Sequence, residues 1–235
     1  MNSNQAKVKC VWVLASAPVG DPHISLRWAP LADRVVAADG GMFLASRLGI
    51  TPDVVVGDLD SYDPALLEDL LASGVEVRQY QHHLKMETDT ELAMLVALEW
   101  QPETIVLMGA IGGRLDHSLA NVLLLTHPQL APMDVRIIDG NQQVSLAKPG
   151  RWNDVTGNPG DTVTLLPVGK EAQGVCTDGL HWPLNGETLL PGRGRGVSNL
   201  IDQPGARVWV DAGQLLIIVL HGDDGLQAML SGVSR

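Results

Sequence analysis

The sequence predicts an α/β protein in which an N-terminal domain with a parallel β-sheet precedes a C-terminal all-β domain. Up to about residue 147, short apolar runs alternate with amphipathic helical patterns. Beyond that point glycine, proline and turn pairs become dense, and the apolar runs are short and alternating. Hydrophobic residues make up 45% of the chain and aromatic residues only 4%, so both cores should be aliphatic. We therefore place the domains at residues 1–147 and 148–235 and expect the second to be a sandwich or a barrel.

The first domain contains six predicted strands and four predicted helices. Short runs that are apolar throughout are typical of strands buried on both faces of a parallel sheet. The predicted strands cover residues 8–15, 34–38, 53–56, 75–80, 104–108 and 135–139. The predicted helices cover residues 42–48, 64–72, 89–100 and 115–126. This alternation predicts a parallel sheet with helices on both faces.

The second domain contains three clear alternating runs, at residues 162–166, 206–210 and 215–220. Alternation of apolar and polar residues is typical of strands with one buried face. Asp211-Ala212-Gly213 separates the last two runs and predicts a hairpin loop that joins them.

The charge and cysteine content exclude several classes of protein. A net charge of −11 repels nucleic acid and anionic membranes, and it suits a cationic small molecule, a metal-bound nucleotide or plain solubility. Cys10 and Cys176 are too far apart in sequence for a disulfide framework or a zinc site, which favours a reducing, cytoplasmic location. Residues 8–15 are too few to span a bilayer, and no other stretch reaches that length.

Polar motifs follow four of the predicted strands, where open parallel sheets gather functional residues. After the second strand, Asp39, Gly40 and Gly41 allow a sharp turn that presents N–H groups to an anion. After the third, Asp58 and Asp60 are two residues apart and point to the same side of an extended segment. Two close carboxylates predict a magnesium site, although a solvated acidic turn is the alternative.

The segment after the fourth strand predicts a helix start. Thr88 and Glu91 have the spacing of a capping box, which places Asp89 at the first helical position. Capping accounts for Thr88 and Glu91 but not for Asp89 or for Lys85, which could neutralise a phosphate.

A glycine-rich segment after the fifth strand opens a helix and predicts an anion site. Gly112 and Gly113 have the spacing of neither a Walker A loop nor a Rossmann fingerprint. Arg114, His117 and Asn121 are spaced to share one helical face, and the planar guanidinium of Arg114 suits a phosphate. The alternative for His117 is a capping or packing role.

Four of these segments, in this order, resemble the thiamine pyrophosphokinase family. They are Ala38-Asp39-Gly40-Gly41, Gly57-Asp58-Leu59-Asp60-Ser61, Thr88-Asp89 and Gly112-Gly113-Arg114-Leu115-Asp116-His117. Gly196-Val197-Ser198-Asn199 is similar to a further motif of that family, so the resemblance covers nearly the whole chain.

The resemblance implies a homodimer that uses ATP and Mg²⁺ to convert thiamine to thiamine diphosphate. It implies metal binding by Asp58, Asp60 and Asp89, which with Arg114 form the catalytic set. The remaining nucleotide contacts that it implies are Asp39, Gly40, Gly41, Lys85, Thr88, Gly112, Gly113, Asp116 and His117. It implies that Ser198 and Asn199 bind thiamine, and we expect neither a nucleic-acid nor a membrane partner.

Two departures and two alternatives accompany the resemblance. Met86 and Leu200 stand where the family usually has acidic residues, which puts individual ligand roles in doubt but not the class of reaction. A pyrophosphokinase for another acceptor, such as a hydroxymethyl pterin, would have a similar catalytic half. A binding protein without turnover is the second alternative, and the converging carboxylates argue against it. Trp152, Trp182 and Trp209 are candidates to stack on thiamine or to fill the core.

Overall fold

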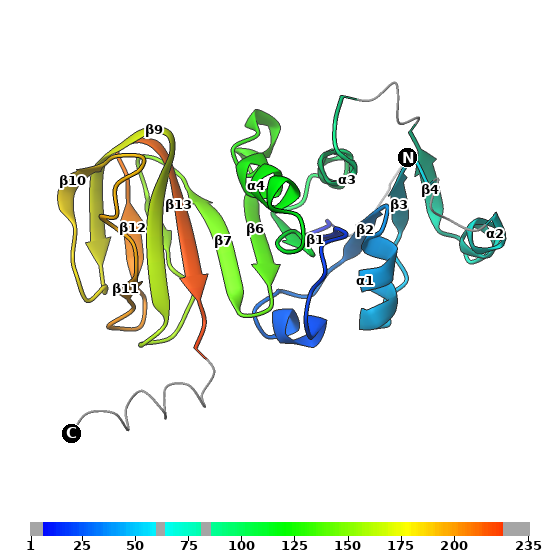
Figure 1. Cartoon of the computed structure of the whole chain (residues 1–235), viewed down its shortest axis with the longest axis horizontal. Coiled ribbons are helices and arrows are strands. Elements are labelled where there is room, and N and C mark those ends of the chain that lie inside the picture. The colour runs from blue at the N-terminus through cyan, green and yellow to red at the C-terminus, as the bar shows by residue number, and fades with distance from the viewer. Residues whose placement is uncertain (1–6, 60–63, 81–85, 223–235) are drawn as a thin grey trace. The chain divides into compact units, whose positions relative to one another are not determined.

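The computed structural model describes residues 7–59, 64–80 and 86–222, and the contacts of the chain divide it into two compact units. The first unit is Met1–Gly140 and the second is Asn141–Arg235 (Figure 1). The sequence places the change at residue 147 instead. The difference is one strand, β7 (Gln142–Ala147), which pairs with β13 (Ala212–Leu220) of the second unit.

The first unit contains a six-stranded parallel sheet with the order β4-β3-β2-β1-β5-β6. The strands are β1 (Cys10–Leu14), β2 (Arg34–Ala38), β3 (Val54–Gly57), β4 (Glu76–Gln79), β5 (Thr104–Met108) and β6 (Asp134–Asp139). β1 lies between β2 and β5, with Trp12 opposite Val35 on one side and Val106 on the other. All six predicted strands are present, and the predicted α/β class is confirmed.

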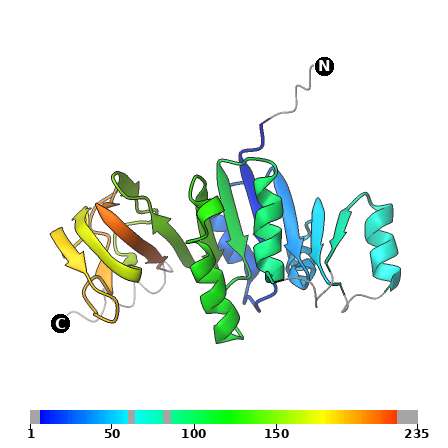
Figure 2. The same ribbon diagram turned by 90° about the horizontal axis from the view of Figure 1, so that it is seen from above.

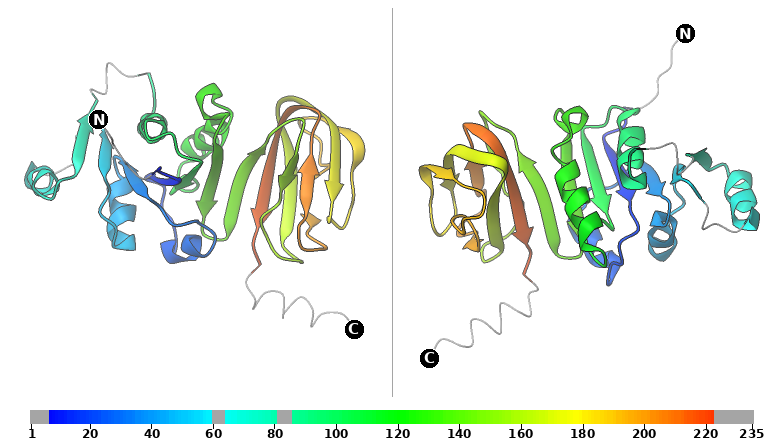
Figure 3. Two further views of the ribbon diagram at one scale, coloured as in Figure 1. Left: turned by 180° about the vertical axis from the view of Figure 1, so that it is seen from behind. Right: turned by 45° about the horizontal axis from the view of Figure 1, so that its top comes forward.

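Helices cover both faces of this sheet. They are α1 (Gly41–Leu48), α2 (Pro64–Ala72), α3 (Asp89–Leu98) and α4 (Leu115–Leu124). Two short 3₁₀ helices, η1 (Pro22–Arg27) and η2 (Pro128–Leu130), are too short to show an amphipathic period in the sequence. Figures 1 and 3 show α3 and α4 on one side of the sheet and α1 on the other. On the α1 side, Trp12 and Leu14 pack with Leu44 and Ala45.

Two glycines allow close packing at the carboxyl end of β1. A Cβ atom at Gly41, the first residue of α1, would overlap the carbonyl oxygen of Leu14. A Cβ atom at Gly109 would overlap the carbonyl oxygen of Ala15, and Gly109 has a φ of 67°. The segments that follow β2 and β5 both lie directly against the end of β1, and the lack of a Cβ atom in glycine makes this close approach possible.

The second unit is an antiparallel β-domain organised around one long strand, β9 (Thr162–Asp178) (Figure 2). Its first half pairs with β13 and β11 (Asn199–Leu200), and its second half pairs with β10 (Asn185–Leu189) and β12 (Arg207–Trp209). β8 (Trp152–Asp154) pairs with β12. The core between these strands is aliphatic, and its buried members include Val163, Leu165, Leu184, Leu189 and Leu215.

The predicted hairpin at Asp211-Ala212-Gly213 is wrong. β12 pairs with β8 and β9, whereas β13 pairs with β7 and β9, so the two strands flank different parts of β9. The N–H of Asp211 donates to the carbonyl oxygen of Gln173 in β9 at 2.9 Å. The turn therefore carries the chain from one set of strands to the other. Among the described residues, none of the helices has the length and hydrophobicity of a membrane-spanning segment.

Candidate active site

The first unit has a topological switch point at the carboxyl ends of β1 and β5. The two strands are neighbours, but the chain continues from β1 to β2 on one side and from β5 to β6 on the other. Open α/β sheets bind ligands at such points because the diverging connections leave a crevice. The segment after β1, Ala15-Ser16-Ala17-Pro18, and the glycine-rich segment after β5 both lie there.

Two adjoining cavities occupy this position, each with a volume of about 260 Å³. We call the first the aspartate cavity, and it is lined by Ser16, Ala38, Asp39, Glu87, Thr88, Asp89, Thr90 and His117. The second, the glycine-loop cavity, is lined by Ala15, Ser16, Ala17, Pro18, Thr90, Gly109, Gly112, Gly113, Arg114, His117 and Asn121. The two cavities share the lining residues Ser16, Thr90 and His117 and are therefore direct neighbours.

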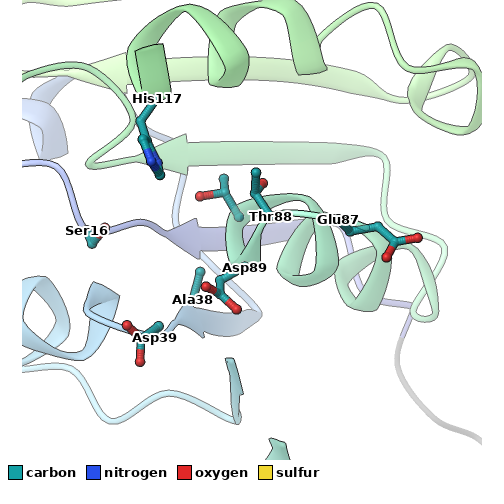
Figure 4. A pocket seen from close by; sticks show the side chains of 8 residues that line it. Ser16, Ala38, Asp39, Glu87, Thr88, Asp89 and His117 are labelled. Atoms are coloured by element: carbon teal, nitrogen blue, oxygen red, sulfur yellow. The ribbon is translucent and has the colours of Figure 1, made fainter. Parts of the chain in front are cut away.

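The aspartate cavity brings together carboxylates from the end of β2 and from the start of α3. Figure 4 shows the side chains of Asp39 and Asp89 directed into one space, whereas Glu87 points away from it. Asp39 follows β2 and has a φ of 38°, in the left-handed region that residues other than glycine rarely adopt. Strained backbone of this kind is concentrated at functional sites. The cavity therefore presents two negative groups from a fixed backbone.

The start of α3 places Asp89. The Thr88 hydroxyl accepts a hydrogen bond from the Glu91 N–H at 3.1 Å, which confirms Thr88 as the N-cap of α3. Thr88 and Asp89 both line the aspartate cavity, and Glu91 lines neither cavity. The cap thus turns the first helical residue toward the site.

The glycine-rich segment lies against the segment that follows β1. Gly112 has a φ of 138° and Gly113 a φ of 60°. Cβ atoms at these positions would come within 3.0 Å of the Pro18 carbonyl oxygen and 3.1 Å of the Pro18 Cδ. Both glycines are therefore needed for the backbone conformation and for the close approach. His117, in the first turn of α4, lines both cavities.

Arg114 lies at the mouth of the glycine-loop cavity and is paired with Asp116. Its Nε and Nη2 atoms donate to the two carboxylate oxygens of Asp116 at 3.1 and 2.5 Å. The hydrogen bond from Arg114 lowers the pKa of Asp116 to about 2, and the same pair raises the pKa of Arg114. The Arg114 side chain is 70% exposed, so it can reach a ligand from solvent. The pair holds the guanidinium at the start of α4.

Asp139, the last residue of β6, lines neither cavity but binds the glycine-rich segment, and the sequence analysis did not single it out. Its buried carboxylate accepts hydrogen bonds from the N–H groups of Gly109, Ala110 and Ile111 at 2.5, 2.8 and 2.7 Å. Burial raises the pKa of Asp139 against the opposing effect of these three donors. Ser16 and Thr90 were also missed, although the small residues after the first strand are a usable signal.

The predicted ligands Asp58, Asp60 and Lys85 are only partly described. Asp60 and Lys85 fall outside the described residues. Asp58 is half-buried beyond β3 and lines neither cavity, but Gly57, just before it, lies against Asp39 (a Cβ at Gly57 would be 3.0 Å from the Asp39 Cβ). Within residues 7–59, 64–80 and 86–222, no three His, Cys, Asp or Glu side chains are grouped as metal ligands.

In the second unit, Ser198 and Asn199 have opposite environments. Ser198 is exposed, has a φ of 57°, and its N–H donates to the Thr164 hydroxyl at 3.0 Å. Asn199 is 4% exposed. Its amide accepts from the Trp182 N–H at 3.0 Å and donates to the Trp182 carbonyl oxygen at 2.7 Å. Asn199 thus fixes the backbone of Trp182, while Ser198 faces solvent.

The three candidate tryptophans also differ. Trp152 and Trp209 make an edge-to-face pair with ring centroids 5.8 Å apart, and the guanidinium of Arg207 covers Trp152 at 4.6 Å. Trp182 is 50% exposed and contacts His181 edge to face at 4.7 Å. Trp182 is therefore the most exposed of the three.

Comparison with known proteins identifies related chains over both units. Residues 27–137 match the model of the thiamin pyrophosphokinase catalytic domain, and residues 153–215 match that of the thiamin pyrophosphokinase vitamin B1 binding domain. The thiamine pyrophosphokinase of Bacillus subtilis is 27% identical over 164 residues, which are 70% of this chain and 76% of that protein. Thiamine pyrophosphokinase 1 of rice, Oryza sativa subsp. japonica, is 24% identical over 186 residues, 74% of this chain and 69% of that one.

Solved structures agree with these matches. The crystal structure of the Bacillus subtilis thiamine pyrophosphokinase has a TM-score of 0.79 and 24% identity, and the match covers 92% of this chain and all of that one. The Geobacillus thermodenitrificans enzyme has a TM-score of 0.75 and 25% identity, with 92% and 98% covered. The matched models, the similar sequences and the shared fold together show that this chain belongs to the thiamine pyrophosphokinase family.

Proposed function

We propose that this chain transfers a pyrophosphoryl group from ATP to the hydroxyl group of thiamine, yielding thiamine diphosphate and AMP. The observation that carries the proposal is the pair of neighbouring cavities at the switch point of the first unit. There Asp39 and Asp89 face a cavity that adjoins Arg114 and the start of α4. Phosphoryl transfer requires carboxylates that hold a divalent metal ion and a positively charged side chain that binds phosphate.

The chemistry needs positioning and charge balance more than covalent participation. The thiamine hydroxyl oxygen forms a bond to the β-phosphorus of ATP. The bond from that phosphorus to the oxygen bridging it to the α-phosphorus breaks, and AMP leaves with the electron pair. The hydroxyl proton passes to a carboxylate at the site or to water. Arg114 would bind phosphate oxygens in this proposal, since it lines the glycine-loop cavity, and His117 lines both cavities.

The oxygen donors of the aspartate cavity fit magnesium. Asp39 and Asp89 supply carboxylates there, Thr88 and Thr90 supply hydroxyl groups, and Mg²⁺ favours one or two carboxylates together with phosphate oxygens. We propose that Asp39 and Asp89 hold the ion together with Asp58 and Asp60. The bound ion would neutralise phosphate charge during transfer.

The match of the second unit to a vitamin B1 binding domain supports thiamine as the acceptor over a hydroxymethyl pterin. We also propose a cytoplasmic homodimer. The resemblance to the family supports the dimer, and light scattering would test it. The free thiols of Cys10 and Cys176 support a reducing compartment.

Release of AMP from ATP should depend on both thiamine and magnesium. We expect one AMP for each thiamine diphosphate formed, because one bond at the β-phosphorus is exchanged for another. Chromatography of the nucleotide and thiamine products measures this ratio. Chelation of Mg²⁺ with EDTA should stop the reaction, and added Mg²⁺ should restore it.

Parallel reactions with a hydroxymethyl pterin, and with no acceptor, are the controls. Formation of ADP, AMP release without thiamine, or preference for the pterin would each contradict the proposed function.

Ser198→Ala and Asn199→Ala should weaken thiamine binding in different ways. Ser198→Ala removes an exposed hydroxyl and should raise the Kd of thiamine about tenfold with no change in stability, as expected for one lost hydrogen bond. Asn199→Ala leaves the backbone groups of Trp182 unpaired, so it should also lower the free energy of unfolding by about 2 kcal/mol. Calorimetric titration and urea unfolding measure the two quantities.

Val197→Ala is the matched control, since Val197 is exposed in the same turn and has no polar side-chain atom. It should leave the Kd of thiamine unchanged, and all three variants should bind ATP normally. Unchanged thiamine affinity in the Ser198→Ala variant would remove that hydroxyl from the acceptor site.

A further inference from the structure

Three side chains form hydrogen bonds with the backbone of the glycine-rich segment, residues 109–114. Asp139 accepts from the N–H groups of Gly109, Ala110 and Ile111. The Asn121 Nδ2 donates to the Ala110 carbonyl oxygen at 2.9 Å, and the Ser118 hydroxyl accepts from the Gly112 N–H at 3.0 Å. The Ser118 hydroxyl also donates to the Arg114 carbonyl oxygen at 2.9 Å. Partners within the protein therefore engage four consecutive N–H groups, from Gly109 to Gly112.

This arrangement is unlike a loop whose N–H groups surround a phosphate. The first part of the segment turns its N–H groups toward Asp139. Gly113 and Arg114, at its end, line the cavity at the start of α4. The contacts available to an anion are therefore concentrated at Arg114 and the first turn of the helix.

The carboxylate and the loop fix each other. Asp139 is 7% exposed, and burial of an ionised carboxylate is costly unless hydrogen bonds compensate for lost water. Its three N–H partners belong to consecutive residues, so the carboxylate favours one conformation of the segment. A different conformation would leave a buried charge without these bonds. The loop should consequently be rigid where it precedes Arg114.

We propose that Asp139 is a positioning residue for the nucleotide, which acts by fixing Gly109–Ile111 and thereby the place of Arg114 at the glycine-loop cavity. The proposal rests on the proposed function, in which this cavity binds ATP. Asp139 itself lines neither cavity and acts through the loop. Rigid support of this kind lowers the cost of arranging the site when the substrate binds.

The Asp139→Asn variant tests the proposal. An amide offers one acceptor oxygen in place of two, and its NH₂ group opposes at least one of the three backbone donors. We expect the KM of ATP to rise about 10- to 100-fold and kcat to fall about tenfold, by analogy with loss of a group that orients a ligand. The KM of thiamine should stay within about twofold of the unmodified protein. Hydrogen exchange should show faster exchange at Gly109–Ile111.

Asp161→Asn is the matched control. Asp161 is also a buried carboxylate with three donors, namely the N–H groups of Asn158 and Gly222 at 2.9 and 2.8 Å and the Nδ1 of His221 at 3.0 Å. It belongs to the second unit, so its replacement should lower stability without changing the KM of ATP or exchange at Gly109–Ile111. A selective ATP defect in Asp139→Asn therefore cannot be ascribed to general instability.

Ser118→Ala provides a second variant if Asp139→Asn does not fold. It loosens the other end of the segment and should raise the KM of ATP about 3- to 10-fold, with the KM of thiamine unchanged. An unchanged KM of ATP in a folded Asp139→Asn variant, despite faster exchange at Gly109–Ile111, would overturn the proposal. So would an unchanged KM of ATP in Ser118→Ala where Asp139→Asn does not fold. Failure of the proposed function is distinguishable, because the unmodified protein would then release no AMP in response to thiamine.

Discussion

Asp89→Asn should lower kcat by about 10²–10³-fold, because it replaces the charged oxygen ligand that we propose at the aspartate cavity with a neutral group of the same shape. The fold should persist, since the Thr88 cap uses the Glu91 N–H and not the Asp89 side chain. Loss of a negative charge in the first turn of α3 should cost only about 0.3–1 kcal/mol of stability. Steady-state kinetics over a range of Mg²⁺ concentrations measure the effect, and the variant should need more Mg²⁺.

Glu91→Gln is the control for Asp89→Asn. It removes the other negative charge in the first turn of α3, but Glu91 lines neither cavity. Its kcat should therefore stay within about twofold of the unmodified protein. Asp58→Asn extends the test to the segment after β3, where we expect the same loss of turnover with the fold intact. Full activity of Asp89→Asn at ordinary Mg²⁺ concentrations would rule out this metal site.

Arg114→Ala should lower kcat/KM for ATP by about 10²–10³-fold, the loss typical of a preorganised group that meets developing charge. Both kcat and the KM of ATP should change, because a contact to phosphate strengthens as charge moves to the leaving group. Arg114→Lys should recover little activity, since an ammonium group lacks the planar fork that engages two oxygens. Initial rates at varied ATP and saturating thiamine measure these changes.

Arg34→Ala is a matched control for Arg114→Ala. Arg34 is also an exposed arginine paired with an aspartate, Asp53, but it is the first residue of β2 and so lies at the amino edge of the sheet. Its replacement should leave kcat/KM for ATP unchanged. If Arg114→Ala changed only the affinity for thiamine, Arg114 would belong to the acceptor side of the site.

The sheet of the first unit is predictable because most of its strands are nearly continuous apolar runs, which are typical of a parallel sheet covered on both faces, although β4 (Glu76–Gln79) is polar. The predicted strands also indicate where the candidate site lies, because open parallel sheets gather functional residues beyond the carboxyl ends of their strands. Asp39, Asp89 and Arg114 follow predicted strands or begin predicted helices. The hairpin prediction fails because β9 contains Pro167 and Gly169, which indicate an end to the strand. In the structure β9 continues past them and takes β12 and β13 as separate partners.

The missed residues have a different cause. Asp139 binds backbone N–H groups, and backbone partners leave no pattern of residue types in the sequence. Asn199 matches a motif, but its amide forms hydrogen bonds with the backbone of Trp182. This contact depends on how two segments that are distant in the sequence pack together. A motif therefore identifies such residues as important without showing whether they contact the ligand or a neighbouring segment.

The switch point also has a consequence for synthesis of the protein. The site combines segments that follow β1 and β5, and the second of these is held by Asp139 at the end of β6. A nascent chain that has not yet emerged from the ribosome as far as Asp139 has the residues of the aspartate cavity but not the fixed glycine loop. Nucleotide bound as we propose should therefore stabilise the first unit fully only after the last strand of the sheet has joined.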